Sequence, residues 1–190
     1  VNSCLVKLAQ EAGHLSKPLA LAIDSSHIRK SGKHTPGLGK YWESKAAKAV
    51  SGLEVSCCAI IDLTGNYALP LDALQTPSSL AEGKSRLDHY VQHLNSVLST
   101  LPGELLFDVK YVVADAYYAK QGFIDAVVGA GKHAIGKLRC AANLKYLYEG
   151  HPTGKPGRPK FYDGKVDFQD FSKWQLVSRE QTEKQTLTTY

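Results

Sequence analysis

The chain contains the run PLALAID at residues 18–24 and the run YVVAD at residues 111–115. Each is a short apolar stretch that stops at a carboxylate, Asp24 in the first and Asp115 in the second. Such a run is typical of a buried strand that presents its last side chain at the edge of a sheet. Taken singly, each aspartate reads more simply as a residue that ends a strand, where turns favour Asp. Two such strands side by side would instead bring two carboxylates within reach of one divalent cation.

The order of the remaining elements shows that the two strands can be neighbours. Strand and helix periodicities alternate along the chain. The first elements are a strand over 19–24, a hairpin over 53–62 and 67–74, and a helix over 85–101. The strand that ends at Asp115, a helix over about 119–130 and a short strand over 133–137 follow. This order predicts an α/β fold with a mixed sheet flanked by helices. The first and fourth strands can then lie parallel, which is the ribonuclease-H-like topology.

Local signals fix several details of this prediction. Ser85 is a natural N-cap with Asp88 three residues later, and Pro102-Gly103 should end the helix. Pro70 indicates an edge strand or a bulge. Residues 41–50 read as a short helix or a lid. In the helix over 119–130 we expect four apolar residues to face inward, namely Phe123, Ile124, Val127 and Val128.

We divide the chain into three parts. Residues 1–17 are a lead-in or the end of a helix, residues 18–139 are part of a ribonuclease-H-like catalytic core, and residues 140–190 are the start of a β-rich insertion. Residues 140–165 are rich in Gly, Pro, Tyr and basic side chains. The sequence has no methionine and ends in a strand-like run. We therefore expect it to be a piece of a longer protein.

The composition is that of an ordinary globular protein, with 43% hydrophobic and 22% charged residues. No apolar stretch approaches the length of a membrane span, and no secretory pattern opens the chain. The four cysteines lack the spacing of a zinc site. We expect them to be reduced and mostly buried, in a cytoplasmic protein.

Basic residues are concentrated in two segments of this chain, whose net charge is +5. Residues 27–48 hold six Lys or Arg against one Glu, and residues 131–165 hold eight against two acidic residues. Clustering of this kind favours a polyanionic partner such as DNA. Two ordinary lysine-rich loops remain the alternative.

Four stretches resemble the DDE transposases of bacterial insertion sequences, in the cut-and-paste branch with a β-rich insertion. They are AIDSSHIRKSGK at 22–33, GLEVS at 52–56, VVADAYYA at 112–119, and IGKLR at 135–139, the last followed by GRPK at 157–160 and YDGK at 162–165. No single motif is specific to the family. The ordered set carries the resemblance from Ala22 to Lys165.

The resemblance implies a metal-dependent site. In this family three acidic residues on a ribonuclease-H-like core bind two Mg²⁺ (or Mn²⁺) ions, and Asp24 and Asp115 match the first two. The third is a glutamate on a helix after the insertion. The late glutamates Glu149, Glu180 and Glu183 lie in no helix-periodic run. We therefore expect the third carboxylate to lie beyond this chain.

Eight further residues are candidates for DNA contacts: His27, Lys30, Lys33, Lys40, Arg139, Arg158, Lys160 and Trp174. The first two could meet the scissile phosphate or be solvated loop positions. Lys33 and Lys40 could bind the DNA backbone in a salt-dependent way. Arg139 could contact phosphate or form a structural salt bridge.

The last three candidates lie in the expected insertion. Arg158 and Lys160 belong to GRPK, which resembles an arm that enters the minor groove, although a flexible turn explains it better. Trp174 could stack on a flipped base, although a core tryptophan is the default.

The expected function is therefore that of a transposase core, which cleaves DNA strands and joins them in transposition. The expected partners are double-stranded DNA and a second copy in a homodimer, without a membrane, in the bacterial cytoplasm at the nucleoid. Two alternatives remain open. One is a ribonuclease-H-like metal nuclease or resolvase, and the other is a decayed or domesticated piece that only binds DNA.

Overall fold

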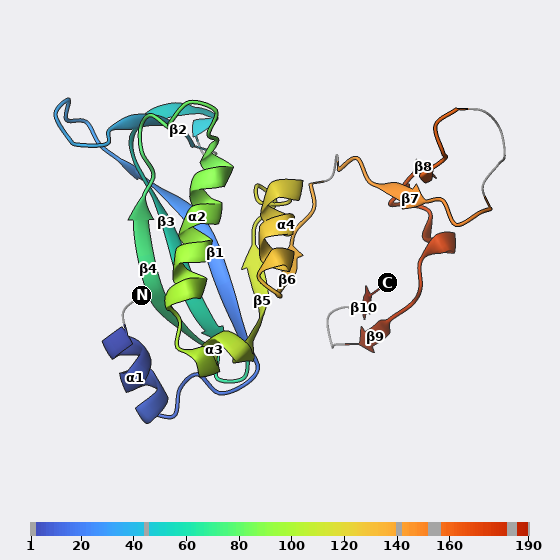
Figure 1. The fold of residues 1–190 in the computed structure, drawn as a ribbon, viewed down its shortest axis with the longest axis horizontal. Helices are drawn as coiled ribbons and strands as arrows, with labels where there is room; N and C mark the ends of the chain where they lie inside the picture. Colours follow the sequence, from blue (N-terminus) through green and yellow to red (C-terminus); the bar gives the residue numbers. More distant parts are fainter. Residues whose placement is uncertain (1–2, 44–45, 140–141, 152–156, 182–185, 190) are drawn as a thin grey trace. The chain divides into compact units, whose positions relative to one another are not determined.

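A six-stranded mixed sheet forms the centre of the first 139 residues (Figure 1). Its strands are β1 Leu19–Arg29, β2 Gly39–Glu43, β3 Lys48–Asp62, β4 Tyr67–Gln75, β5 Val109–Ala114 and β6 His133–Gly136. The order across the sheet is β2-β3-β1-β5-β6, with β4 also paired to β3. Strands β1, β5 and β6 run parallel, and the others are antiparallel to their neighbours. This is the ribonuclease-H-like arrangement predicted from the order of the elements.

The computed structural model describes residues 3–43, 46–139, 142–151, 157–181 and 186–189. The chain divides into two units, Val1–Arg139 and Cys140–Tyr190, which we describe separately. The extents of the catalytic core and the insertion stay predictions. Within the described ranges, no helix has both the length and the apolar character that a membrane crossing needs.

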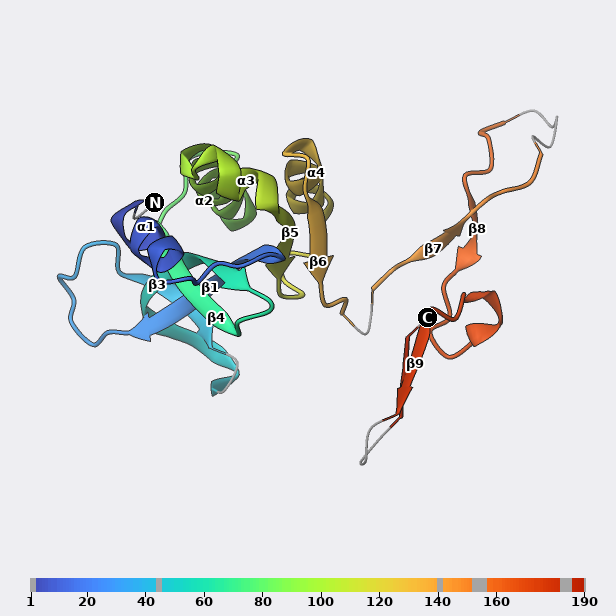
Figure 2. The ribbon, with the colours of Figure 1, turned by 90° about the horizontal axis from the view of Figure 1, so that it is seen from below.

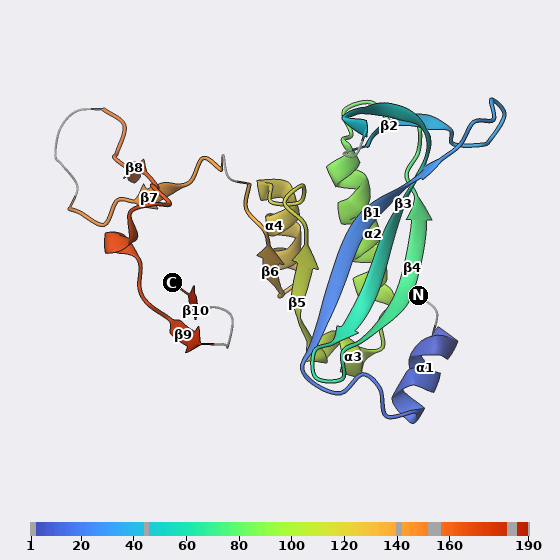
Figure 3. The ribbon, with the colours of Figure 1, turned by 180° about the vertical axis from the view of Figure 1, so that it is seen from behind.

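Four helices accompany the sheet: α1 Ser3–Glu11, α2 Arg86–Thr100, α3 Gly103–Asp108 and α4 Gln121–Gly129. Figure 2 shows α2, α3 and α4 over the same face of the sheet, and Figure 3 shows the strands from behind. Leu94 and Val97 of α2 are fully buried and belong to the same core cluster as Leu21 and Ile60 of the sheet. Every second residue of β3 from Gly52 to Asp62 is buried, so one face of this strand carries the core.

The first strand is longer than predicted. It does not end at Asp24 but continues to Arg29, because residues 24–29 pair with Gly52–Cys57 of β3. Most of the described residues in 41–50 are strand rather than helix, since 41–43 lie in β2 and 48–50 in β3, while residues 44–45 lie outside the described ranges. In both cases the long partner strand β3 supplies backbone hydrogen bonds that override the local polar composition.

The helices follow the predicted signals more closely. Ser85 and Asp88 form a capping box at the start of α2. Pro102 ends α2 but also caps α3, a short helix that the sequence analysis missed. In α4, Phe123 and Val127 are buried, whereas Ile124 and Val128 are exposed, because the helix turns only one stripe toward the sheet.

Two smaller expectations have different outcomes. Pro70 lies on β4, which pairs only with β3 within the sheet, and the register shifts between Cys58 and Ala59, so both an edge and an irregularity are present.

Cys4 and Cys57 are exposed and only Cys58 is buried, so the expectation of mostly buried cysteines was wrong for those two. Cys140 lies outside the described residues.

The second unit consists of short elements. Strands β7 Lys145–Leu147 and β8 Tyr162–Lys165 are antiparallel, as are β9 Ser178–Gln181 and β10 Thr186–Thr189. A 3₁₀ turn, η2 Phe171–Lys173, precedes β9. Trp174 is half-buried, with the rings of Phe168 and Phe171 at 6.1 and 6.3 Å.

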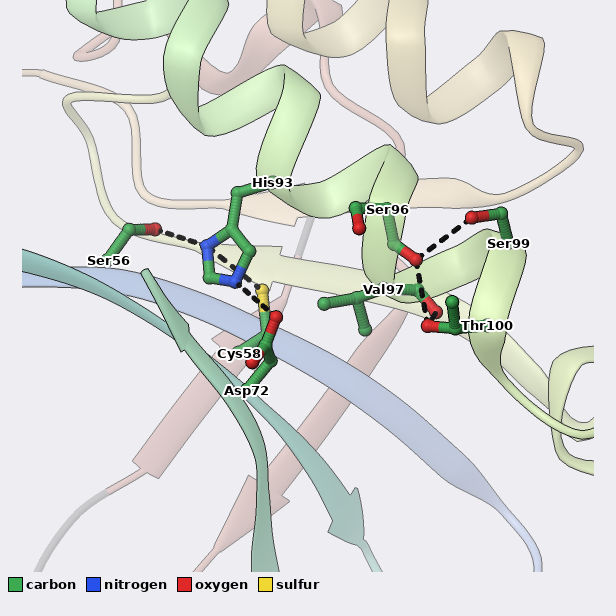
Figure 4. Close-up of polar contacts among 8 residues, drawn as sticks. All are labelled: Ser56, Cys58, Asp72, His93, Ser96, Val97, Ser99 and Thr100. Atoms are coloured by element: carbon green, nitrogen blue, oxygen red, sulfur yellow. Dashed lines mark hydrogen bonds and ion pairs between the residues drawn. The ribbon is translucent and has the colours of Figure 1, made fainter. Parts of the chain in front are cut away.

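A buried polar cluster joins α2 to the sheet. His93 of α2 is 1% exposed, its Nδ1 lies 2.8 Å from Ser56 Oγ, and its Nε2 lies 3.4 Å from Asp72 Oδ2 (Figure 4). These residue types resemble a Ser-His-Asp triad. However, Ser56 is 0% exposed, so no substrate could reach its hydroxyl. The cluster instead fixes how α2 sits on β3 and β4.

The burial of His93 predicts that acid destabilises the fold. Loss of solvent around the ring lowers the pKa of His93 below 6.5, although Asp72 acts against this, and burial lowers the pKa of His89 in the same direction. Below about pH 6.5 the unfolded chain therefore binds more protons than the folded chain. The free energy of unfolding consequently decreases as the pH is lowered. Urea unfolding at a series of values from about pH 8 to about pH 5 measures this slope.

A matched pair of variants assigns the slope. His93→Gln should reduce the pH dependence to the contribution of His89, whereas His34→Gln, at an exposed position in the loop after β1, should leave it unchanged. An undiminished slope in His93→Gln would show that other groups cause it.

Candidate active site

The register of β1 and β5 places Asp24 and Asp115 at equivalent positions. The parallel pairing runs from Leu19 to Ile23 on β1, and its last pair is Ile23 with Ala114. The residue after each of these two is an aspartate, Asp24 within β1 and Asp115 directly after β5. The pairing of β1 with β5 therefore ends where β1 itself continues, and the two carboxylates follow at that point.

Each carboxylate is held by a nearby backbone N–H group. Asp24 Oδ1 accepts a 2.8 Å hydrogen bond from the N–H of Ser25, and Asp115 Oδ1 accepts one of 2.8 Å from the N–H of Tyr117. The pKa of Asp24 is raised above 3.8, mainly because partial burial disfavours the charged form. The hydrogen bond from Ser25 opposes this shift, and the charge of Asp115 adds to it. The two carboxylates therefore interact.

Both aspartates line one hollow of about 400 Å³. Its walls come from β1, β2, β3, α2, the loop after β5 and the segment after β6, and its lining residues are Asp24, Ser25, Trp42, Glu54, Arg86, Tyr90, Asp115, Tyr117, Tyr118 and Arg139. Three carboxylates and two guanidinium groups thus face a common space.

One wall of the hollow contains the carboxylate of Glu54, which interacts with two residues of α2. Glu54 of β3 is 8% exposed and accepts a hydrogen bond from the hydroxyl of Tyr90. Its other oxygen lies 3.7 Å from Nη1 of Arg86, the first residue of α2. The negative charge of Glu54 is therefore paired within the protein.

Tyr118 contributes a buried hydroxyl to the same hollow. Its side chain is 1% exposed. Burial raises the pKa of this phenol, an interaction with the Ser25 side chain acts against this, and the charges of Tyr90, Asp24 and Asp115 raise the pKa further. The hydroxyl consequently stays protonated.

The donor set suits a hard divalent cation. Asp24 and Asp115 provide carboxylate oxygens, which Mg²⁺ and Mn²⁺ prefer, and such ions commonly keep several water ligands beside one or two carboxylates. In the described part of the chain, no group of three or more His, Cys, Asp or Glu side chains is placed to hold a metal. A metal ion at this pair would need further ligands from elsewhere.

Comparison with known proteins identifies the family. A family model described as DDE superfamily endonuclease matches residues 1–190, the whole of this chain. The chain belongs to the DDE superfamily endonucleases. No curated protein and no solved structure gives a significant match. Membership assigns the chain to proteins of the nuclease and transposase type, for which DNA is the substrate.

The structure places the predicted DNA-binding residues of this DDE chain in different environments. Arg139 lines the same hollow as the two aspartates. His27 does not, because its ring lies against Tyr41 and over Gly52. Lys30 lines a separate hollow with Arg29 and Lys48. Lys33 is exposed in the loop before β2, and Lys40 is exposed on β2.

The three candidates of the second unit are described only within that unit. Arg158 has its guanidinium 5.9 Å from the ring of Phe161. Lys160 forms a 2.7 Å ion pair with Asp163. Trp174 belongs to the cluster with Phe168 and Phe171. Their roles in DNA binding stay predictions.

The sequence analysis missed several residues of the hollow, of which Glu54 and Arg86 matter most. Glu54 belongs to the stretch GLEVS, and the alternation of β3 puts it on the buried face with Ser56 and Cys58. That position was a recognisable signal, because a buried carboxylate requires a partner. Arg86 carried no signal beyond its place after the N-cap Ser85, since its position in the hollow depends on how α2 packs.

The proximity of the aspartates predicts a measurable coupling. Asp115→Asn removes a like charge and should lower the pKa of Asp24, as followed by NMR titration of the carboxyl carbons. Asp125→Asn, at an exposed position of α4, is the matched control and should leave that pKa unchanged. An unaltered Asp24 titration in Asp115→Asn would show that the two carboxylates do not share a site.

Proposed function

We propose that this chain forms part of the catalytic core of a transposase, which performs metal-dependent DNA strand cleavage and strand transfer. The observation that supports this most is the position of Asp24 and Asp115, which follow the last paired residues of two parallel strands and line one hollow. In this proposal the two aspartates hold Mg²⁺ or Mn²⁺, up to two ions in the complete site.

Both reactions are in-line attacks on a phosphodiester, by water in cleavage and by a 3′-hydroxyl in strand transfer. When bound, the metal would supply Lewis-acid stabilisation of the attacking and leaving oxygens. Asp24 and Asp115 fix the ligand oxygens through their short, backbone-anchored side chains. Tyr118 is 1% exposed and closes one side of the hollow.

The basic residues support DNA as the ligand of the exposed surface. Arg139 lies in the hollow itself, and Arg29, Lys30 and Lys48 line a second hollow on the same unit. We propose that Lys33 and Lys40 add contacts to the backbone, and that the active complex is a homodimer at the nucleoid. We also propose that the described residues lack the third carboxylate, so that this chain alone cleaves poorly.

The metal proposal predicts a specific loss on mutation. Mn²⁺ should raise the melting temperature of the chain, and Asp24→Asn or Asp115→Asn should remove this effect, because each deletes one of two ligands. Asp125→Asn should retain it. A Mn²⁺ response that survives in both active-site variants would overturn the assignment of the site.

Cleavage of a supercoiled plasmid in Mg²⁺ or Mn²⁺ tests the remaining claim. We expect at most weak nicking by the chain alone. Rapid nicking that Asp24→Asn abolishes would support a self-sufficient metal nuclease. It would overturn the proposal that an essential carboxylate is missing. DNA binding without metal binding by the wild-type chain would instead favour a piece that only binds DNA.

A further inference from the structure

Arg86 enters the hollow from a rigid part of the fold. It is the first residue of α2, directly after the N-cap Ser85, whose side chain and that of Asp88 satisfy each other's backbone groups. The start of the helix is therefore fixed. The side chain of Arg86 then reaches the hollow that Asp24 and Asp115 share.

Two residues of β2 hold the guanidinium in place. Its Nη2 donates a 3.3 Å hydrogen bond to the carbonyl oxygen of Lys40, and its central carbon lies 4.6 Å from the centroid of the Tyr41 ring. Tyr41 is 1% exposed, and its hydroxyl donates to the carbonyl oxygen of Thr76 at 3.2 Å. The ring under the guanidinium is thus itself anchored.

Glu54 lies near the guanidinium of Arg86 but does not form a hydrogen bond with it. The distance of 3.7 Å from its carboxylate to Nη1 of Arg86 exceeds a hydrogen bond, so the contact is electrostatic. A guanidinium has five N–H groups, and within the described residues only Nη2 of Arg86 makes a hydrogen bond. About a third of the side chain is open to solvent, with an exposed fraction of 36%.

We propose that Arg86 is a phosphate-binding residue of the active-site hollow and that Glu54 is its positioning residue, an inference that rests on the proposed function. A guanidinium can donate two parallel hydrogen bonds to a phosphate, whereas a hydroxyl group can donate only one. In this hollow Arg86 provides a fixed cation beside the two aspartates, whereas Arg139 lies on the segment after β6. Arg86 would hold the DNA backbone next to the bond that reacts.

The competing interpretation is that Arg86 only neutralises Glu54. Under that interpretation, Arg86→Gln unfolds or loosens the protein because it leaves a buried carboxylate unpaired. The double variant Glu54→Gln/Arg86→Gln removes both charges and should restore stability in either case. The two interpretations differ in whether DNA binding is restored as well.

The experiment measures binding of a fluorescent duplex by anisotropy, in EDTA, over a series of salt concentrations. For the double variant we expect wild-type-like melting, affinity about tenfold weaker at low salt, and a slope of log K against log salt that is smaller by about 1. Lys17→Gln/Asp108→Asn, which also removes one positive and one negative charge, from an ion pair at the other end of β1 and β5, is the matched control. Its affinity should change less than that of the double variant.

The outcomes separate this inference from the proposed function. Wild-type affinity and slope in the double variant, with the Mn²⁺ response of Asp24 and Asp115 intact, would overturn the role of Arg86 alone. A wild-type chain that binds neither duplex nor Mn²⁺ would overturn the proposed function and this inference with it. An equal loss in Lys17→Gln/Asp108→Asn would show that removing any ion pair of this unit weakens binding, and it would also overturn the inference.

Discussion

The parallel pairing of β1 with β5 is the constraint on which the site depends. It brings together two carboxylates whose mutual repulsion, together with burial, raises the pKa of Asp24. Apolar packing imposes this arrangement. Leu21 and Val112 face each other across the pairing, and both are 0% exposed. Burying each such side chain contributes about 1.5–3 kcal/mol. Both belong to a larger core cluster, which favours this pairing as a whole over the repulsion of one pair of carboxylates. The core therefore sets the register of β1 and β5, and this register determines where the two aspartates lie.

A layer of polar groups under α2 links this core to the hollow. His93 contacts Ser56, and one turn earlier Tyr90 donates to Glu54. Ser56 and Glu54 are neighbours on the buried face of β3. A buried polar group costs free energy unless it is paired, so these contacts penalise any shift of α2 along the sheet. Because Arg86 begins the same helix, the position of its guanidinium is determined by contacts up to two turns away.

The sequence predicted the order of elements and the adjacency of β1 and β5, since hydrophobic runs and helix caps are local signals. The capping box of Ser85 and Asp88 is the clearest example. The extension of β1 to Arg29 and the strand at Tyr41 could not be predicted in this way. Ser25, Ser26 and His27 have no strand pattern of their own, and they are strand residues only because β3 pairs with them. The same holds for the hollow: Asp24 and Asp115 were visible as strand-end carboxylates, whereas Arg86 reaches the site only through the tertiary placement of α2.

The charges of the hollow explain why DNA and metal would bind together there. Asp24, Asp115 and Glu54 carry three negative charges, against two positive charges on Arg86 and Arg139, which leaves a formal charge of −1. Without a metal ion, the carboxylates of this lining weaken the attraction of the two guanidinium groups for a phosphate. One divalent cation at the aspartates changes the balance to +1, and the same guanidinium groups then act with the ion rather than against the carboxylates. Coupling between two ligands is reciprocal, so a bound phosphate would strengthen metal binding by the same factor. In the proposed site the described residues supply two carboxylate ligands, and phosphate oxygens would complete the ligand set of the ion, so this coupling would matter more than in a site with three carboxylates.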